Sequence, residues 1–336
     1  MPPAPASELL GSAHSGAHLI VPYAVCNSPA WLKTVASMPP ASTRQTQALL
    51  RSMRLETANL QSEHSLSPPH ERALAQALGL GAGELEDGLI PWAALDAQRG
   101  LPQARVGQGW AWVTPCHWAM GREQATLTDP AALDLAESES RTLLAAMAPY
   151  FDTDGIRLHY GRPDRWLAEG EMFRSLPTAS LDRVLGRNVD PWLPGDKTLT
   201  RLQNEMQMLL YTHPANETRS AARQWPVNSF WLSGTGTLTQ PPSPSPSPSP
   251  TAPDLAHRGD PSGRHSEAMT SATGQPLALT RTLAEAVFRD DWVGYAEAWA
   301  AVVAGPVSDL LARQRAGLGV RLTLCGERGF ETWRSG

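Results

Sequence analysis

Apolar residues recur along this chain at two spacings, and segments of the two kinds alternate. Consecutive or alternating apolar residues predict strands over residues 18–24, 110–114, 156–160, 228–232 and 320–325. Apolar residues three or four positions apart predict helices over residues 41–60, 67–79, 136–148, 198–211, 280–289, 291–303 and 306–316. Because strands alternate with helices, we expect an α/β fold with a mixed or mainly parallel sheet covered by helices.

The helix over 67–79 has the clearest ends. Ser67 is of the type that caps helix N-termini, Pro68 suits the first helical position, and Gly79 suits the stop after the last turn.

The first and last predicted strands, 18–24 and 320–325, are both apolar runs near the ends of the chain. We therefore expect these two strands to share one sheet that closes a single core.

Two segments have no periodicity. Residues 1–16 are rich in Pro, Ala, Ser and Gly, and we expect a disordered tail there. Residues 239–275 contain the alternating Pro and Ser run Pro241–Pro250, which suits neither helix nor sheet and predicts a disordered Pro/Ser-rich insert. The remaining residues, 17–238 and 276–330, then form one composite α/β domain.

Composition excludes several function classes. The chain of 336 residues has 28 Lys and Arg against 33 Asp and Glu, and a net charge of -5 argues against nucleic-acid binding. Its three cysteines, Cys26, Cys116 and Cys325, lie far apart without a Cys-x-x-Cys, so we predict neither a disulfide framework nor a zinc site. No apolar run approaches the roughly 20 residues of a membrane helix, and the N-terminus has no signal-peptide pattern. We expect a cytoplasmic protein without membrane contact.

Familiar catalytic motifs fit this sequence poorly. Gly234-Thr-Gly236 follows a predicted strand but lacks the third glycine of a dinucleotide-binding loop. Ser233 is not in a Gly-x-Ser-x-Gly nucleophile elbow. Cys116 and His117 are neighbours on a strand and would point to opposite faces of the sheet. We therefore expect no catalytic residue, no metal and no cofactor.

The densest group of polar residues lies between the predicted helix 198–211 and the end of the predicted strand 228–232. The candidate ligand-binding residues are His213, Asn216, Arg219, Asn228, Ser233, Gly234 and Gly236. An Arg fork and two Asn amides could together hold a phosphorylated or carboxylated small molecule. The alternative is that the Asn side chains only fix loop backbone while the Arg faces solvent.

The same segment carries a resemblance. The order of a helix, His213-Pro-x-Asn-x-x-Arg219, Pro226-x-Asn228, an apolar strand and Gly-x-Gly resembles the archaeal type of cofactor-independent phosphoglycerate mutase. The similarity extends over residues 110–238, in the order of that family's inserted substrate domain. The family belongs to the alkaline phosphatase superfamily, whose metal domain needs an Asp-Gly after the first strand, a Ser nucleophile and paired Asp and His ligands. Here the first strand runs into Pro22–Asn27, which contains no Asp.

The chain as a whole resembles the bacterial RpfE-type regulatory protein family, whose members are often labelled phosphoglycerate mutase. The segments that carry this resemblance are 65–72, 110–118, 204–214 and 322–327. The resemblance implies a regulatory role and no mechanism, and the Ser-Pro run is not part of the family pattern.

Two hypotheses follow. The first is a non-catalytic regulatory or small-anion-binding protein of the RpfE type, related to phosphoglycerate mutase without its metal site. The second is a phosphoglycerate mutase-like enzyme that acts on phosphorylated three-carbon acids. The residues that would bind two metals separate the two hypotheses, because phosphoryl transfer of that kind needs several carboxylates and imidazoles close together.

Overall fold

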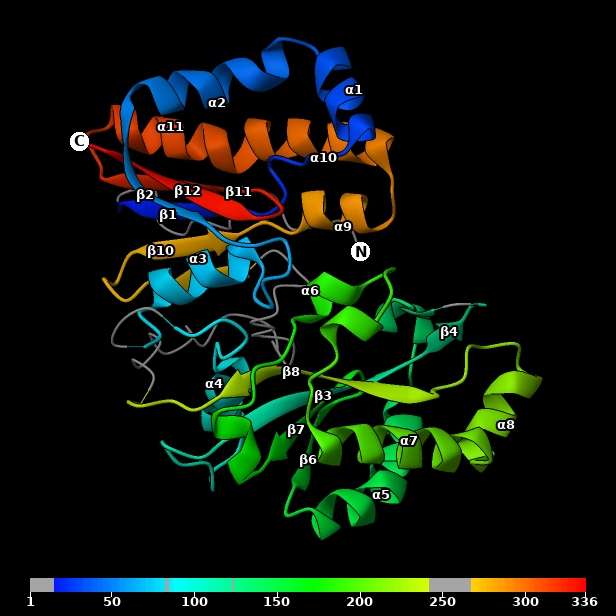
Figure 1. Cartoon of the computed structure of the whole chain (residues 1–336). Coiled ribbons are helices and arrows are strands. Elements are labelled where there is room, and N and C mark those ends of the chain that lie inside the picture. The colour runs from blue at the N-terminus through cyan, green and yellow to red at the C-terminus, as the bar shows by residue number, and fades with distance from the viewer. Residues whose placement is uncertain (1–14, 82–84, 123, 242–266) are drawn as a thin grey trace. The chain divides into compact units, whose positions relative to one another are not determined.

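The computed structural model describes residues 15–81, 85–122, 124–241 and 267–336 (Figure 1). Its contacts divide the chain into two compact units. Unit 1 comprises the described residues of Met1–His64, Pro68–Leu80 and Ser243–Gly336. Unit 2 comprises those of Ser65–Ser67 and Gly81–Pro242. Residues 1–14 of the predicted tail (1–16) and residues 242–266 of the predicted insert (239–275) lie outside the described residues.

Unit 1 is built on a six-stranded sheet with the order β2-β12-β11-β1-β10-β9. The strands are β1 (Ala17–Val21), β2 (Met53–Leu60), β9 (Glu267–Thr270), β10 (Pro276–Leu279), β11 (Val320–Cys325) and β12 (Gly329–Ser335). The central strand β1 is parallel to both of its neighbours, β10 and β11, and the other pairs are antiparallel. Leu19 lies opposite Leu322 in this register, which confirms that the first predicted strand and the strand at 320–325 share one sheet.

Helices cover both faces of this sheet. Figure 1 shows α2, α10 and α11 along one face and α3 along the other. The helices of unit 1 are α1 (Pro29–Ser37), α2 (Ala41–Arg51), α3 (Pro69–Leu78), α9 (Thr282–Phe288), α10 (Trp292–Val302) and α11 (Ser308–Arg315), with a π-helical turn at Val303–Val307. Alternate strand residues such as Leu19 and Leu322 pack with Trp299 and Leu310 in one apolar core. This mixed sheet covered by helices confirms the predicted fold class.

A row of buried polar side chains crosses the face that lies under α3. His18 Nε2 lies 2.8 Å from Thr323 Oγ1, and Thr323 Oγ1 lies 2.8 Å from Thr332 Oγ1. The three residues belong to β1, β11 and β12, so the row connects three adjacent strands. Buried polar groups of this kind need partners, and here the strands supply them to one another.

Unit 2 has a four-stranded antiparallel sheet with the order β6-β7-β3-β8 and a small β4-β5 hairpin. The strands are β3 (Trp110–Cys116), β4 (Trp118–Met120), β5 (Ala125–Leu127), β6 (Arg157–Arg162), β7 (Arg165–Glu169) and β8 (Ser229–Gly236). The helices are α4 (Trp92–Gly100), α5 (Glu137–Thr153), α6 (Leu181–Val184), α7 (Lys197–Tyr211) and α8 (Pro214–Ala221), with 3₁₀ turns at Pro130–Leu133, Glu171–Arg174 and Asp190–Trp192. Leu143 of α5 and Leu202 of α7 pack on Val113 and Trp166 of the sheet.

Four expectations about the elements were wrong. Residues 41–60 form α2 and then β2 instead of one helix, and Met53 and Leu60 belong to the strand. Ser67 does not cap α3, because Pro68 holds that position and the Ser67 hydroxyl accepts a hydrogen bond from the Gly88 N–H. The predicted insert ends earlier than 275, since 267–270 form β9. A further strand, 329–335, follows the one predicted to be last.

Two of these errors follow from what the sequence pattern can distinguish. A pattern with apolar residues at 49, 50, 53 and 60 fits a helix as well as a helix followed by a strand, because β2 lies at the sheet edge and exposes most of its side chains. Strand β9 has only four residues and follows polar sequence.

None of the described helices has the length and apolar character needed to cross a membrane.

Candidate functional site

The segment predicted to bind a ligand is largely helical. His213 caps α8, and its Nδ1 accepts a hydrogen bond from the Ala215 N–H. Asn216 and Arg219 therefore lie on a helix and not on a loop, and both are buried. The motif His-Pro at the start is a helix signal, because a capping side chain followed by proline suits the first turn.

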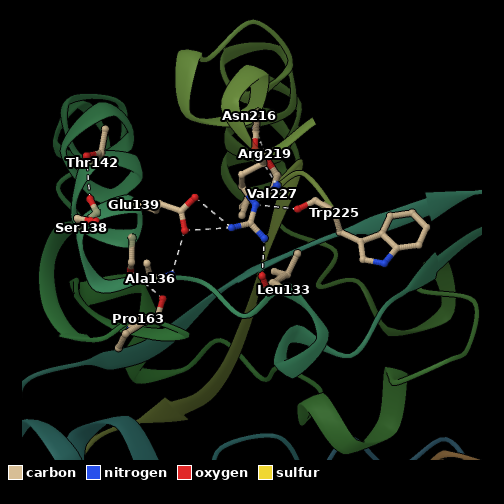
Figure 2. A network of polar contacts seen from close by, with 11 residues as sticks. Leu133, Ala136, Ser138, Glu139, Thr142, Pro163, Asn216, Arg219, Trp225 and Val227 are labelled. Carbon is tan, nitrogen blue, oxygen red and sulfur yellow. Dashed lines mark hydrogen bonds and ion pairs between the residues drawn. The ribbon is translucent and has the colours of Figure 1, made fainter. Parts of the chain in front are cut away.

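Arg219 is the centre of the contacts in this segment (Figure 2). Its side chain is fully buried, Nε donates to the Trp225 carbonyl at 2.8 Å, and Nη2 donates to the Leu133 carbonyl. Nη1 lies 3.1 and 3.2 Å from the two carboxylate oxygens of Glu139. The guanidinium thus joins α8, the loop after it, a 3₁₀ turn and the start of α5. The expected alternative in which this Arg faces solvent is wrong.

The two asparagines hold backbone. Asn216 Nδ2 donates to the carbonyls of Leu210 and Val227, and Asn216 Oδ1 accepts from the Val227 N–H. Asn228 binds both the N–H and the carbonyl of Trp118, at 2.7 and 3.0 Å. These contacts are the ones expected of side chains that fix the loop, and a ligand role for them stays a prediction.

Ser233, Gly234 and Gly236 do not form a turn at the end of a strand, because they lie within β8. Gly234 has φ +63°, and a Cβ there would lie 2.7 Å from the Trp112 indole. A side chain at this position is therefore excluded both by backbone conformation and by close packing. The two glycines allow the Trp112 ring and the Leu89 backbone to approach the strand.

A different polar cluster lies in unit 1, at the carboxyl ends of the parallel strands. We call it the carboxyl-edge cluster, and its members are Tyr23, His70, Thr280, Arg281 and Phe288. Tyr23 follows β1, and Thr280 and Arg281 follow β10. His70 lies in the first turn of α3, and Phe288 ends α9. In α/β proteins, ligands bind outside the carboxyl ends of parallel strands, which makes this edge the expected place for a site.

Hydrogen bonding in the cluster involves strong donors. Arg281 Nη1 lies 3.2 Å from His70 Nε2, and both residues are at least 98% buried, with exposed fractions of 2% and 1%. An Arg can only donate, so His70 Nε2 is the acceptor and the ring is neutral in this contact. The buried Thr280 hydroxyl has no hydrogen-bond partner in the described part of the chain. Such a hydroxyl can take a partner that the described residues do not supply, such as a bound ligand or a water molecule.

Aromatic rings are part of the carboxyl-edge cluster. The Tyr23 ring lies 5.2 Å from Phe288 and 6.1 Å from the His70 ring. The Arg281 guanidinium carbon lies 5.9 Å from the centre of the Phe288 ring. The Phe288 ring is at the outer limit of a cation–π contact, and burial of the Arg281 side chain keeps bulk water from it, which strengthens charge-assisted hydrogen bonds.

The cysteine near this edge is not a nucleophile. Burial, with a smaller contribution from the Glu327 charge, raises the pKa of the Cys26 thiol to about 12. Burial also raises the pKa of the Cys325 thiol above its ordinary value. Both sulfurs are therefore protonated near neutral pH, and thiolate chemistry is not available there. Within the described ranges, no three His, Cys, Asp or Glu side chains come together as metal ligands.

Sequence reasoning did not select Tyr23, Thr280 or Arg281. Strand β10 has four residues and borders the segment predicted to be disordered, so the strand end that presents Thr280 and Arg281 was not recognised. His70 was part of the Ser65–Arg72 motif, but its partner Arg281 lies 211 positions away. The one local signal that could have found them is the polar pair Thr280-Arg281, which directly follows the apolar run 277–279.

Comparisons with known proteins give distant likenesses. No family model and no curated protein matches the chain. The chain is similar in structure to a cofactor-independent phosphoglycerate mutase from Thermoplasma acidophilum DSM 1728, at 12% identity and a TM-score of 0.34, over 95% of this chain and 89% of that chain. It is also similar to the PH0037 protein from Pyrococcus horikoshii, at 12% identity and a TM-score of 0.44, over 96% of this chain and 88% of that chain. Likenesses at these TM-scores carry no argument about the chemistry of the site.

Proposed function

We propose that this protein is a non-catalytic regulatory protein that binds a small phosphorylated or carboxylated molecule at the carboxyl-edge cluster of unit 1. One observation carries the proposal: the buried Thr280 hydroxyl, without a hydrogen-bond partner in the described residues, directly precedes the buried Arg281. A hydroxyl and a guanidinium at the end of a parallel strand are the donors that an oxyanion needs. A bound anion would supply the partner that the hydroxyl lacks.

The residues of the cluster favour binding over chemistry. Arg281 supplies a permanent positive charge, His70 is neutral in its contact with it, and neighbouring Cys26 is a protonated thiol. The segment after the first strand, Pro22–Asn27, has no carboxylate that could hold a metal or serve as a base. The resemblance to the RpfE-type family supports a regulatory role. The three cysteines of this chain are free and buried, which fits a reducing compartment such as the cytoplasm.

A substitution at Thr280 gives the sharpest test of the site. Thr280→Val keeps the shape of the side chain and removes the buried hydroxyl, so the free protein should be as stable as wild type or slightly more so. Thr46→Val is the matched control, since Thr46 in α2 also has a buried hydroxyl without a partner in the described residues. At an anion concentration 100 times Kd, binding stabilises the folded protein by about 2.7 kcal/mol.

The measurement is a thermal-shift titration with inorganic phosphate, 3-phosphoglycerate and lactate. We expect at least one anion to raise the melting temperature of wild type and Thr46→Val, and to lose this effect in Thr280→Val. Arg281→Gln should also lose the effect, while exposed Arg289→Gln should keep it. Equal stabilisation of wild type and Thr280→Val would refute the site.

The second candidate function is a phosphoglycerate mutase-like enzyme. The observation in its favour is that unit 2, which includes residues 110–238, forms a compact unit with its own sheet, as the resemblance to the substrate domain implies. The test is mutase activity of the purified full-length chain on 3-phosphoglycerate with added Mn²⁺. Turnover within the range of ordinary enzymes, about 1–1000 per second, would overturn the non-catalytic proposal.

A further inference from the structure

The loop after β1 holds Tyr23 in a backbone conformation that needs support. Tyr23 has φ +54°, in the left-handed region that non-glycine residues rarely adopt. The Tyr295 hydroxyl of α10 donates to the Tyr23 carbonyl at 2.9 Å, with the Ala24 carbonyl at 3.4 Å. The Ala24 N–H donates to the Cys325 carbonyl at 2.8 Å, which fixes the loop from the side of β11. Tyr295 therefore supports the residue whose ring lies against His70.

The same hydroxyl also holds α1. The Trp31 indole N–H donates to Tyr295 Oη at 3.0 Å, so this oxygen accepts one hydrogen bond and donates another. Burial raises the pKa of Tyr295, which keeps the hydroxyl protonated and able to donate. Helix α1 has no buried residue, and Leu32 on its outer face is 59% exposed. Trp31 is thus its main attachment in the described contacts.

An apolar cluster runs parallel to this hydrogen-bonded connection. Tyr23, Cys26 and Ala284 form its buried centre, and Trp31 and Phe288 pack against it. Phe288 is the ring beside the Arg281 guanidinium, and Tyr23 is the ring beside His70. The residues that attach α1 are therefore in contact with the residues that would surround the anion.

We propose that Tyr295 is a positioning residue through which occupancy of the anion site is transmitted to α1. This inference rests on the proposed function and adds its regulatory output. An anion bound by Thr280 and Arg281 restricts the rings of His70 and Tyr23, the Tyr23 carbonyl holds the Tyr295 hydroxyl, and the hydroxyl holds the Trp31 indole. Helix α1 becomes more firmly attached when the site is filled. A partner protein can then distinguish the two states at the exposed surface of α1.

Amide hydrogen exchange of the full-length chain tests the connection without any ligand. Tyr295→Phe removes the hydroxyl and should raise exchange in residues 29–37 about fivefold to tenfold, the effect of losing one hydrogen bond. Trp31→Phe removes the indole donor together with part of the ring and should also raise the exchange rate in residues 29–37, so the contact is still tested if Tyr295→Phe folds poorly. Tyr211→Phe is the matched control, because Tyr211 is 86% exposed. Unchanged exchange in 29–37 in both variants would overturn the proposal.

A second arm uses inorganic phosphate, and then lactate, as the probe. In wild type the probe that stabilises the protein should slow exchange in residues 29–37 at least threefold, and in Tyr295→Phe it should still bind while the slowing disappears. If a probe binds to wild type without any change of exchange in residues 29–37, transmission to α1 is refuted and the proposed anion binding stands. If neither probe stabilises wild type, the proposed function fails, and the ligand-free comparison still decides whether Tyr295 holds α1.

Discussion

Acidification should destabilise unit 1 through His18. Burial, followed by the charge of Arg321, lowers the pKa of His18 from 6.5 to about 4, and Glu56 opposes this shift weakly. His18 is 7% exposed and its Nε2 contacts Thr323, so protonation would place a charge in the sheet interior. The folded state therefore binds this proton less readily than the unfolded state does.

The direction and size of this pH effect on the free energy of unfolding follow from the difference between the folded-state and unfolded-state pKa of His18. Because the pKa is lower in the folded state, the stabilisation is complete above pH 6.5 and is lost as the pH falls from 6.5 through 4. One unit of pKa difference corresponds to about 1.36 kcal/mol, so the loss reaches about 3 kcal/mol at pH 4. This loss is a large part of the ordinary stability of a domain.

Urea unfolding of the full-length chain at pH 7 and pH 4 measures the effect. His18→Gln keeps an amide that can bond to Thr323 but cannot be protonated, and its loss of stability between the two pH values should be about 3 kcal/mol smaller than that of wild type. His64→Gln is the control, since the His64 side chain is 78% exposed. If wild type and His18→Gln lose the same free energy, His18 is not the acid-sensitive group.

Four further predictions concern stability. Arg219→Met leaves the Glu139 carboxylate without its partner and should lower the free energy of unfolding by about 3 kcal/mol in urea titrations, with an effect below 1 kcal/mol counting against the argument. Asn228→Ala should lower it by about 1–3 kcal/mol, because two backbone groups of Trp118 lose their partner. Removal of 318–336 deletes β11 and β12 and should abolish cooperative unfolding of unit 1, so a folded truncation would contradict the sheet order. Deletion of 242–266, chosen for its Pro and Ser content, should change the melting temperature by only a few degrees, and a large drop would show that the segment stabilises the fold.

The sequence predicts those parts of the fold that local physics decides. Strands β1 and β11 are short runs made mostly of apolar residues, and the residue after α3 is Gly79, whose φ of +67° suits glycine. The boundary between α2 and β2 depends on pairing with β12 from the far end of the chain, which no local pattern reports. Long-range pairing with β1 also decides where β10 lies, so the strand end at Thr280 was missed.

For the two candidate sites too, local sequence indicates the residue types, and long-range contacts decide which residues meet. The residue types at 213–228 correctly indicate a segment with many hydrogen bonds, but sequence does not reveal their partners. Arg219 contacts Glu139, which lies 80 positions earlier in the chain. In the contacts observed, Arg219 therefore connects parts of the fold to one another. His70 and Arg281 are each ordinary in the sequence, and they meet only because α3 packs on β1 while Arg281 follows the neighbouring parallel strand β10.

The central position of β1 has a consequence for biosynthesis. Both neighbours of β1 come from the last quarter of the chain, and His18 and its partner Thr323 are 305 positions apart. At translation rates of about 5–20 residues per second, the ribosome needs roughly 15–60 s after β1 to make its neighbour β11. During that interval the apolar residues of β1 have no sheet to join, whereas every residue of unit 2 emerges before β10. We therefore expect the nascent chain to need a chaperone at its N-terminal segment until translation is almost complete.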